Sequence, residues 1–266
     1  VEIEDDDLAG KRALRMRGIS FDHYDGRLWT KTTHETEELP RSDPSTWTTR
    51  DDPTRLIQGL GTPLKQTIYL EPLQMDRRMV FGEPVIDSLS IDNAQLDRLR
   101  RNPTRFYRDG SGDISTKTPA DVALRYHVTS MIQDLKRARP RLGNATLSGN
   151  QRERYLQLPP GLDERLRPLR DEMLDGIESR ADPLADAVAI ESYLRTRFRY
   201  STEGGHDAER PLEDFLFNLK AGHCEYFASS MVVLLRTLGI PARPANGFYG
   251  GAYNTFGRYY QIRQAD

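Results

Sequence analysis

Apolar residues in the first half of the chain follow the two-residue period of β-strands. Residues 64–70 and 122–128 alternate apolar and polar side chains, which predicts strands that each bury one face. Asp-Gly pairs at 25–26 and 109–110 stand between shorter apolar runs and predict hairpin turns. Residues 1–137 are therefore predicted to form an antiparallel β-rich module, built as a sandwich or a barrel.

Two polar stretches show neither the strand period nor the helix period. Residues 31–62 contain prolines and few apolar side chains, so we expect a loop there, with Trp47 held against a surface. Residues 138–154 are rich in Arg, Gly and Asn, which predicts a linker. The chain is accordingly expected to divide into a module of residues 1–137 and a second domain of residues 155–266.

From residue 155 the apolar spacing changes to the three- and four-residue intervals of helices. Three stripes share this spacing, and they comprise Leu162, Leu166, Leu169, Met173 and Ile177; Ala187, Ile190, Leu194 and Phe198; and Phe227, Met231, Leu234, Leu235 and Leu238. Pro168 falls inside the first stripe, so a regular helix is expected to begin only at the proline. Asp182 followed by Pro183 is a strong start signal for the second helix. Two strand-like runs follow the third helix, at residues 242–249 and 259–264, with a loop over residues 247–257.

The third helical stripe begins beside the only cysteine of the chain, Cys224. Gly222 permits a tight turn into this helix, while Gly239 and Pro241 end it. Cys224 thus falls in the first helical turn, where backbone N–H groups have no intrahelical partner and the helix dipole is positive. That position favours the thiolate, which is the nucleophilic form of cysteine. A buried cysteine that only fills space is the alternative interpretation.

The residues around Cys224 carry a family resemblance. Residues 214–228 read Asp-Phe-Leu-Phe-Asn-Leu-Lys-Ala-Gly-His-Cys-Glu-Tyr-Phe-Ala, and residues 234–243 read Leu-Leu-Arg-Thr-Leu-Gly-Ile-Pro-Ala-Arg. Together they resemble the core of the bacterial transglutaminase-like superfamily, and most closely its membrane-anchored subgroup with an extracytoplasmic transglutaminase-like domain. Residues 155–160 resemble the start of that catalytic domain, and residues 25–29 and 69–72 resemble the β-rich region that precedes it.

The resemblance implies an α+β fold and a reaction. The fold is a β-rich module followed by a papain-like, transglutaminase-like core over residues 155–266, with Cys224 at a helix N-terminus. The reaction is thiol-dependent acyl transfer on peptide-linked glutamine, in which Cys224 is the nucleophile and lysine or another amine accepts the acyl group. The backbone N–H of Cys224 can donate to the oxyanion. Further candidates for oxyanion donors or cleft-lining residues are Tyr200, His223, Glu225 and His206.

The general base is not assigned to any residue of this chain. His223 precedes Cys224 directly, and consecutive helical side chains diverge by about 100°. In the family the base lies on the strand after the helix and the acid on the next strand. Here the second strand-like run ends at Asp266, so the resemblance implies a core truncated at its C-terminal end. Base and acid would then lie beyond Asp266, and the 266-residue piece is expected to be inactive.

Composition restricts the function classes further. The net charge of -2 gives no basic field for nucleic acid, and a single cysteine excludes an intramolecular disulfide and a thiolate zinc site. No metal and no cofactor are expected. No apolar run reaches the roughly 18 residues of a membrane span, and the chain begins with Val1. We therefore expect an excised piece of a longer chain, a periplasmic or extracytoplasmic domain whose membrane anchor lies outside it.

Three functions are compatible with these observations. The first is acyl transfer on a protein or peptide substrate, with cell-wall peptides as candidates. The second is a cysteine protease or amidase on the same fold, which amine incorporation would distinguish from the first. The third is a non-catalytic binding or scaffold module that keeps the fold.

Overall fold

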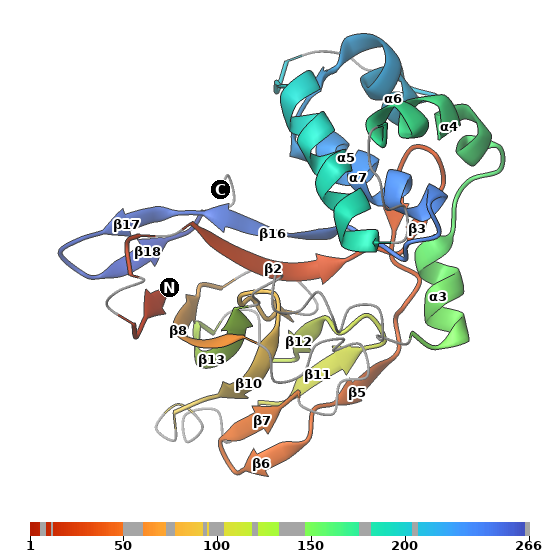
Figure 1. Cartoon of the computed structure of the whole chain (residues 1–266). Coiled ribbons are helices and arrows are strands. Elements are labelled where there is room, and N and C mark those ends of the chain that lie inside the picture. Colours follow the sequence, from red (N-terminus) through yellow and green to blue (C-terminus); the bar gives the residue numbers. More distant parts are fainter. Residues whose placement is uncertain are drawn as a thin grey trace. The chain divides into compact units, whose positions relative to one another are not determined.

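The structure is a computed structural model of the chain, and it divides into two compact units (Figure 1). The β-rich unit comprises Val1–Ser20, Thr33–Thr146 and Ala245–Asp266, and the helical unit comprises Phe21–Thr32 and Leu147–Pro244. Each unit therefore combines segments that are distant in the sequence. The residues that the structure describes are 1–5, 9–11, 13–49, 61–72, 78–92, 95, 104–118, 122–132, 147–175, 182–203 and 207–263.

Antiparallel pairing builds the described strands of the β-rich unit. The larger sheet has the order β17-β18-β1-β8-β13-β10-β7-β6, with bounds Ala252–Asn254, Tyr259–Gln261, Glu2–Ile3, Thr62–Leu70, Leu124–Ile132, Ile86–Ser90, Thr46–Thr48 and Arg41–Asp43. The smaller sheet has the order β5-β11-β12-β9, with bounds Thr36–Glu38, Phe106–Asp109, Ile114–Thr116 and Arg78–Met79. A separate pair joins β2 (Leu14–Ser20) to β16 (Ala245–Gly250), and Figure 1 draws these two long strands side by side.

One hydrophobic core serves both sheets of the β-rich unit. Trp47 on β7 and Phe106 on β11 are fully buried, and their rings meet edge to face with centroids 4.9 Å apart. The strands predicted at 64–70 and 122–128 are β8 and β13, which pair along their length from Leu124↔Leu70 to Ile132↔Thr62. The prediction of an antiparallel β-rich region is confirmed.

The predicted loop over residues 31–62 is wrong in its described part, which contains β5, β6 and β7, while residues 50–60 lie outside the described residues. Trp47 is 0% exposed, so it is a core residue and not a surface anchor. Each of these strands has three residues, too few to produce a readable alternation. The loop predicted over residues 247–257 is wrong for the same reason, since β17 lies within it and forms a hairpin with β18.

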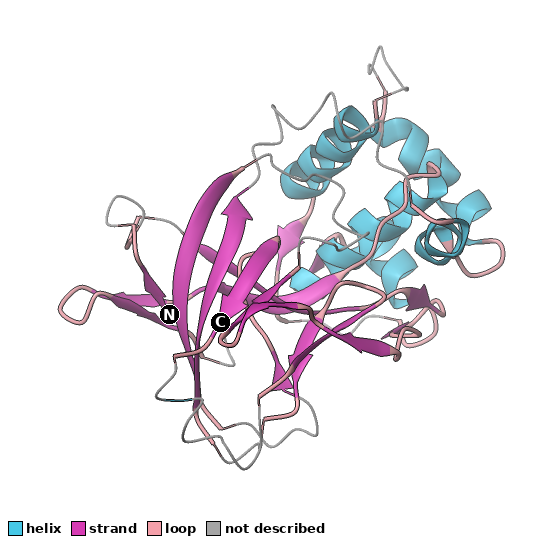
Figure 2. Cartoon of the chain, turned by 90° about the horizontal axis from the view of Figure 1, so that it is seen from below, coloured by secondary structure: helices cyan, strands magenta, loops and turns pink. Residues whose placement is uncertain are grey.

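Helices dominate the other unit (Figure 2). They are α3 (Gly149–Leu156), α4 (Leu162–Met173), α5 (Pro183–Arg197), α6 (Pro211–Glu213), the π-helix η1 (Asp214–Leu219) and α7 (Cys224–Thr237). Two short strand pairs accompany them, β3 (His23–Tyr24) with β4 (Trp29–Thr30) and β14 (Arg199–Tyr200) with β15 (Ala221–Gly222). Leu166, Ile190, Phe215 and Leu234 are fully buried, so four different helices contribute to the core. Among the described residues, no helix combines the length and apolar character that crossing a membrane requires.

The predicted start of α5 is confirmed, and the predicted start of α4 is wrong. The side chain of Asp182 accepts a hydrogen bond of 3.0 Å from the Leu184 N–H and caps α5, as predicted. By contrast, α4 does not begin at Pro168 but runs through it from Leu162. Pro168 and Glu164 are exposed, so water can bond the Glu164 carbonyl that loses its intrahelical partner. Ile177, the last member of the predicted first stripe, lies outside the described residues.

The predicted linker is partly helical. Residues 149–154 belong to α3, and a capping box joins Ser148 and Gln151 at its start. Residues 138–146 lie outside the described part. The Asp25-Gly26 hairpin is confirmed as β3–β4, but it belongs to the helical unit although it precedes most of the β-rich module in sequence. A division of the chain near residues 138–154 stays a prediction, which limited proteolysis tests.

Candidate active site

A short series of backbone features delivers the chain to Cys224. Lys220 ends η1 in the left-handed conformation with φ 49°. The next two residues form β15, which pairs in parallel with β14 so that Gly222 lies opposite Tyr200. His223 is extended, and α7 begins at Cys224. The predicted position of the cysteine in the first turn of the helix is confirmed.

Gly222 is required at this point by packing. A Cβ atom placed there would lie 2.9 Å from a ring carbon of Tyr226 and 3.0 Å from a ring carbon of Phe215. Distances that short do not occur between real side chains without displacement of a neighbour. Gly239 at the far end of α7 has the expected left-handed φ of 72°. The two glycines that bracket the helix thus have different physical roles.

Cys224 is exposed to solvent. This excludes the interpretation that it is only a buried space-filling residue. His223 precedes the helix without forming a side-chain cap. The Tyr226 N–H donates to the His223 carbonyl at 3.1 Å, so among the described residues the N–H groups of Cys224 and Glu225 remain available to an anion. In the part of the chain that the structure describes, no side chain forms a hydrogen bond with the thiol. The geometry is compatible with a nucleophile, and that role stays a prediction.

The structure brings some of the predicted site residues close to Cys224. The His223 ring packs edge to face on the Tyr226 ring, with centroids 4.8 Å apart. Glu225 is exposed and lines a pocket beside the helix. The backbone of Tyr200 is next to Gly222, while its side chain is 62% exposed. His206 lies outside the described residues.

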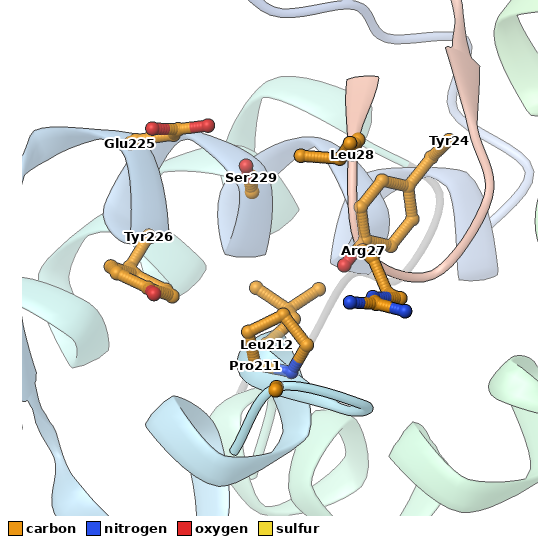
Figure 3. Close-up of a pocket in the computed structure, with 9 residues that line it drawn as sticks. Tyr24, Arg27, Leu28, Pro211, Leu212, Glu225, Tyr226 and Ser229 are labelled. Carbon is orange, nitrogen blue, oxygen red and sulfur yellow. The ribbon is translucent and has the colours of Figure 1, made fainter. Parts of the chain in front are cut away.

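A pocket of about 300 Å³ lies beside α7 (Figure 3). Its lining residues come from the β3–β4 hairpin, from the segment around α6 and from the first two turns of α7, and they are Tyr24, Arg27, Leu28, Ala208, Pro211, Leu212, Glu225, Tyr226 and Ser229. Burial raises the pKa of Tyr24, and burial together with the Glu225 charge raises that of Tyr226. Both phenols are therefore neutral at neutral pH.

The hairpin that forms one wall of this pocket is held by a buried network. The Trp29 indole N–H donates to the Ser229 hydroxyl at 2.8 Å, and the Trp29 ring stacks on Tyr24 with centroids 4.8 Å apart. The Gln157 side-chain amide donates to the Tyr24 carbonyl and accepts from the Tyr24 N–H, both at 2.9 Å. The hairpin is thus fastened both to α7 and to the segment that follows α3.

Arg236 completes this network from the second half of α7. It is 3% exposed, and its guanidinium carbon lies 4.9 Å from the centroid of the Trp29 ring. Its N–H groups donate to the carbonyls of Gln157, Ala242 and Asp22 at 2.7, 2.8 and 3.0 Å. Burial lowers the pKa of Arg236 to about 10, so it is still a cation at neutral pH.

Sequence reasoning did not find most of these residues. Residues 25–29 were assigned to the β-rich module, whereas Trp29 packs against the core of the helical unit. No role was predicted for Arg236 or Gln157, although an arginine inside an apolar helix indicates a buried polar network. The small side chain of Ser229 contacts Trp29, whereas that of Ala228 is exposed.

Comparisons with known proteins agree with the family resemblance. Residues 171–264 match the family model of the transglutaminase-like superfamily. A protein-glutamine gamma-glutamyltransferase of Pseudomonas aeruginosa is 26% identical over 260 residues, which is 97% of this chain and 33% of that protein. The uncharacterized protein YebA of Bacillus subtilis is 39% identical over 118 residues, 41% of this chain and 16% of YebA. The chain spans about a third or less of the length of these relatives.

Solved structures resemble the fold as well. Two crystal structures of the periplasmic domain of TgpA from Pseudomonas aeruginosa, one of them bound to ethylmercury, match with a TM-score of 0.69. Each is 23% identical, and the match covers 99% of this chain and 80% or 78% of those chains. The strand-rich mixed fold is therefore shared with that domain. The chain contains a transglutaminase-like domain over residues 171–264.

Proposed function

We propose that this chain carries the nucleophile of a thiol-dependent acyl transfer on peptide-linked glutamine. The observation that carries the proposal is the exposed Cys224 as first residue of the 14-residue helix α7, inside a transglutaminase-like domain. A relative named as a protein-glutamine gamma-glutamyltransferase supports the choice of glutamine. The similarity to the TgpA periplasmic domain supports an extracytoplasmic location, with a membrane anchor outside this chain. Cell-wall peptides are candidate substrates.

The reaction has two halves. The Cys224 thiolate attacks the carboxamide carbon, the C–N bond breaks, and the departing nitrogen takes up a proton and leaves as ammonia. The resulting thioester is attacked by an amine, which loses a proton and forms an isopeptide bond as the thiolate is released. Water in place of the amine gives glutamate. The N–H groups of Cys224 and Glu225 at the start of α7 can hold the oxyanion of both tetrahedral intermediates.

Protonation of the departing carboxamide nitrogen needs a general acid, and we do not assign this role to His223. That residue lies outside the helix, next to Cys224 in sequence, and its ring contacts Tyr226. We propose that base and acid are supplied from outside these 266 residues. General acid–base catalysis contributes typically 10²–10⁴-fold, so the 266-residue chain should be acylated slowly by a glutamine peptide.

An activated ester tests the nucleophile alone, because its reaction does not require a general acid. The p-nitrophenyl ester of a glutaryl peptide has a leaving group that needs no protonation, so Cys224 should form the thioester and pass it to a labelled amine. Mass spectrometry of the acylated protein and amine incorporation provide the readout, with Cys224→Ala as the control. A glutamine peptide should react far more slowly, because its leaving nitrogen must be protonated and a carboxamide is intrinsically less reactive than an activated ester.

Three outcomes would contradict parts of this proposal. If neither ester nor peptide acylates Cys224, the scaffold interpretation replaces it. Cleavage of peptide bonds without amine incorporation would instead favour a protease or amidase. Rapid turnover of the glutamine peptide would mean that a base is present in this chain, and His206→Ala and His223→Ala would identify it.

A further inference from the structure

The pocket beside α7 combines an apolar wall, two aromatic rings and charged groups at its edge. Leu28, Pro211 and Leu212 supply the aliphatic surface, and Tyr24 and Tyr226 supply the rings (Figure 3). Its volume of about 300 Å³ is at the lower end of the range of ligand pockets. Such a pocket suits a short aliphatic chain with a polar end.

The charges of the lining residues indicate which polar end fits. Arg27 and Glu225 are the charged residues of the lining. Arg27 forms an ion pair of 3.6 Å with Glu209, so its charge is partly compensated. Within the described residues, Glu225 forms no hydrogen bond or ion pair. The uncompensated charge is therefore negative, and neutral tyrosine rings attract cations on their faces.

Glu225 is the residue that follows Cys224, although Cys224 itself is not among the lining residues of the pocket. Cys224 and Ala228 are exposed on one face of α7, one turn apart. Glu225 and Ser229 form the next face, rotated by about 100°, and this face lines the pocket. A group bound at Glu225 therefore lies on the face of the first turn next to the face that carries Cys224.

We propose that this pocket binds a primary alkylammonium, the acyl acceptor of the reaction. The aliphatic stem lies along Leu28 and Leu212, and the ammonium is held by the Glu225 carboxylate and the tyrosine rings. The inference rests on the proposed function for the identity of the ligand as acceptor, and it concerns the binding step alone. A lysine side chain of a peptide and a free diamine share this chemistry.

Binding can be measured without acyl transfer. The Cys224→Ala variant of the 266-residue chain is titrated with n-pentylamine, 1-pentanol and pentanoate at pH 7, with NMR chemical shifts or calorimetry as the readout. The charged amine should bind more tightly than the alcohol, and pentanoate should bind most weakly. Added salt should weaken the amine selectively, because the Glu225 carboxylate is exposed.

Charge variants of the same background identify the residue. Glu225→Gln should weaken the amine by about five-fold, the effect of an exposed ion pair near 1 kcal/mol. Glu153→Gln, which removes an exposed carboxylate of α3 outside the pocket lining, should leave binding unchanged. Arg27→Gln should leave amine binding unchanged or tighten it, since it removes a cation from the pocket edge.

The proposal is overturned if the amine binds no better than the alcohol, or if Glu225→Gln binds it as tightly as the parent. It is equally overturned if pentanoate binds best and Arg27→Gln abolishes pentanoate binding, since the pocket would then bind an anion at Arg27. Titration of cadaverine and of Nα-acetyl-lysine amide shows whether the ligand is a free diamine or a lysine side chain. Binding of either compound supports the site, and binding of neither opposes it. A protein that binds amines but never forms a thioester would refute the proposed function and leave the ammonium site standing.

Discussion

The two ends of α7 differ in almost every physical respect. At its start Cys224 and Glu225 are exposed, and no side chain caps the helix. In its second half Leu234 is 0% exposed and Arg236 is 3% exposed. The Arg236 guanidinium donates to three backbone carbonyls of segments that lie far apart in the sequence. The start of α7 is thus exposed to solvent, whereas its second half is buried and hydrogen-bonded to other segments.

The buried second half of α7 contributes to stability, and the exposed start of the same helix carries the candidate chemistry. The buried half of α7 orients the helix, and with it the first turn that carries the thiol. At the other end Cys224 and Glu225 are exposed and free to contact a substrate, whereas Tyr226 and Phe227 of the same turn pack on the Phe215 ring. Substitutions in the buried half should therefore reduce the free energy of unfolding, and those of the exposed Cys224 and Glu225 should change reactivity or ligand binding alone.

The largest loss of stability is expected from Arg236→Met. The substitution keeps the aliphatic bulk but removes every hydrogen bond to the buried carbonyls of Asp22, Gln157 and Ala242. Leaving such acceptors unpaired costs about 3–5 kcal/mol in total. Chemical denaturation and hydrogen exchange of the α7 amides would measure it.

Arg236→Lys provides the matched control. A lysine keeps the charge but has a single nitrogen with three donors, which cannot reach all three carbonyls with the geometry of a guanidinium. Its stability should lie between the parent and the methionine variant. Parent-like stability of Arg236→Met would mean that the network does not fix α7.

The next largest effect is expected where two neighbouring leucines differ in burial. Leu234 is fully buried, whereas Leu235 is only partly buried, although both belong to the predicted stripe. Leu234→Ala should cost about 2–5 kcal/mol, and Leu235→Ala clearly less. Equal losses in parallel denaturation curves would contradict this order. The same partial burial applies to Phe227, which the sequence had placed with Leu235 on the core face.

A smaller effect is expected for Trp29→Phe. Phenylalanine keeps a ring for the stack with Tyr24 but loses the indole N–H that donates to Ser229 at 2.8 Å. A hydrogen bond of this kind contributes about 1 kcal/mol. A double-mutant cycle with Ser229→Ala isolates the pair, and a coupling energy near zero would show that the bond does not hold the hairpin.

The elements of this fold could be predicted where their periods were long enough to read. Strands β8 and β13 have nine residues each and alternate clearly, and α5 has a proline after a capping aspartate. The three-residue strands around Trp47 could not be predicted, because their identity comes from pairing with residues distant in sequence. The assignment of the β3–β4 hairpin to the helical unit was equally out of reach, since Gln157 and Arg236 determine it.

The candidate site divides in the same way. The position of Cys224 at a helix start followed from two glycines and an apolar stripe, all local features of the sequence. The pocket did not, because its walls come from three segments that only the fold brings together. Glu225 was predicted as a neighbour of the cysteine. That it forms no hydrogen bond or ion pair with any described residue, which makes it a candidate ligand, is visible only in three dimensions.

The smallest effect on stability is expected from Cys224→Ala, which should have the largest effect on thiol reactivity. Cys224 is exposed and contributes nothing to the core of the helical unit, so Cys224→Ala should change the free energy of unfolding by less than about 0.5 kcal/mol. The same variant should lose all labelling by iodoacetamide, since Cys224 is the only thiol of the chain. In the parent, labelling should be complete without denaturant. A thiol that reacts only after unfolding, or an alanine variant as damaged as Leu234→Ala, would mean that the first turn of α7 is part of the buried structure. The contrast between the two ends of the helix would then be lost.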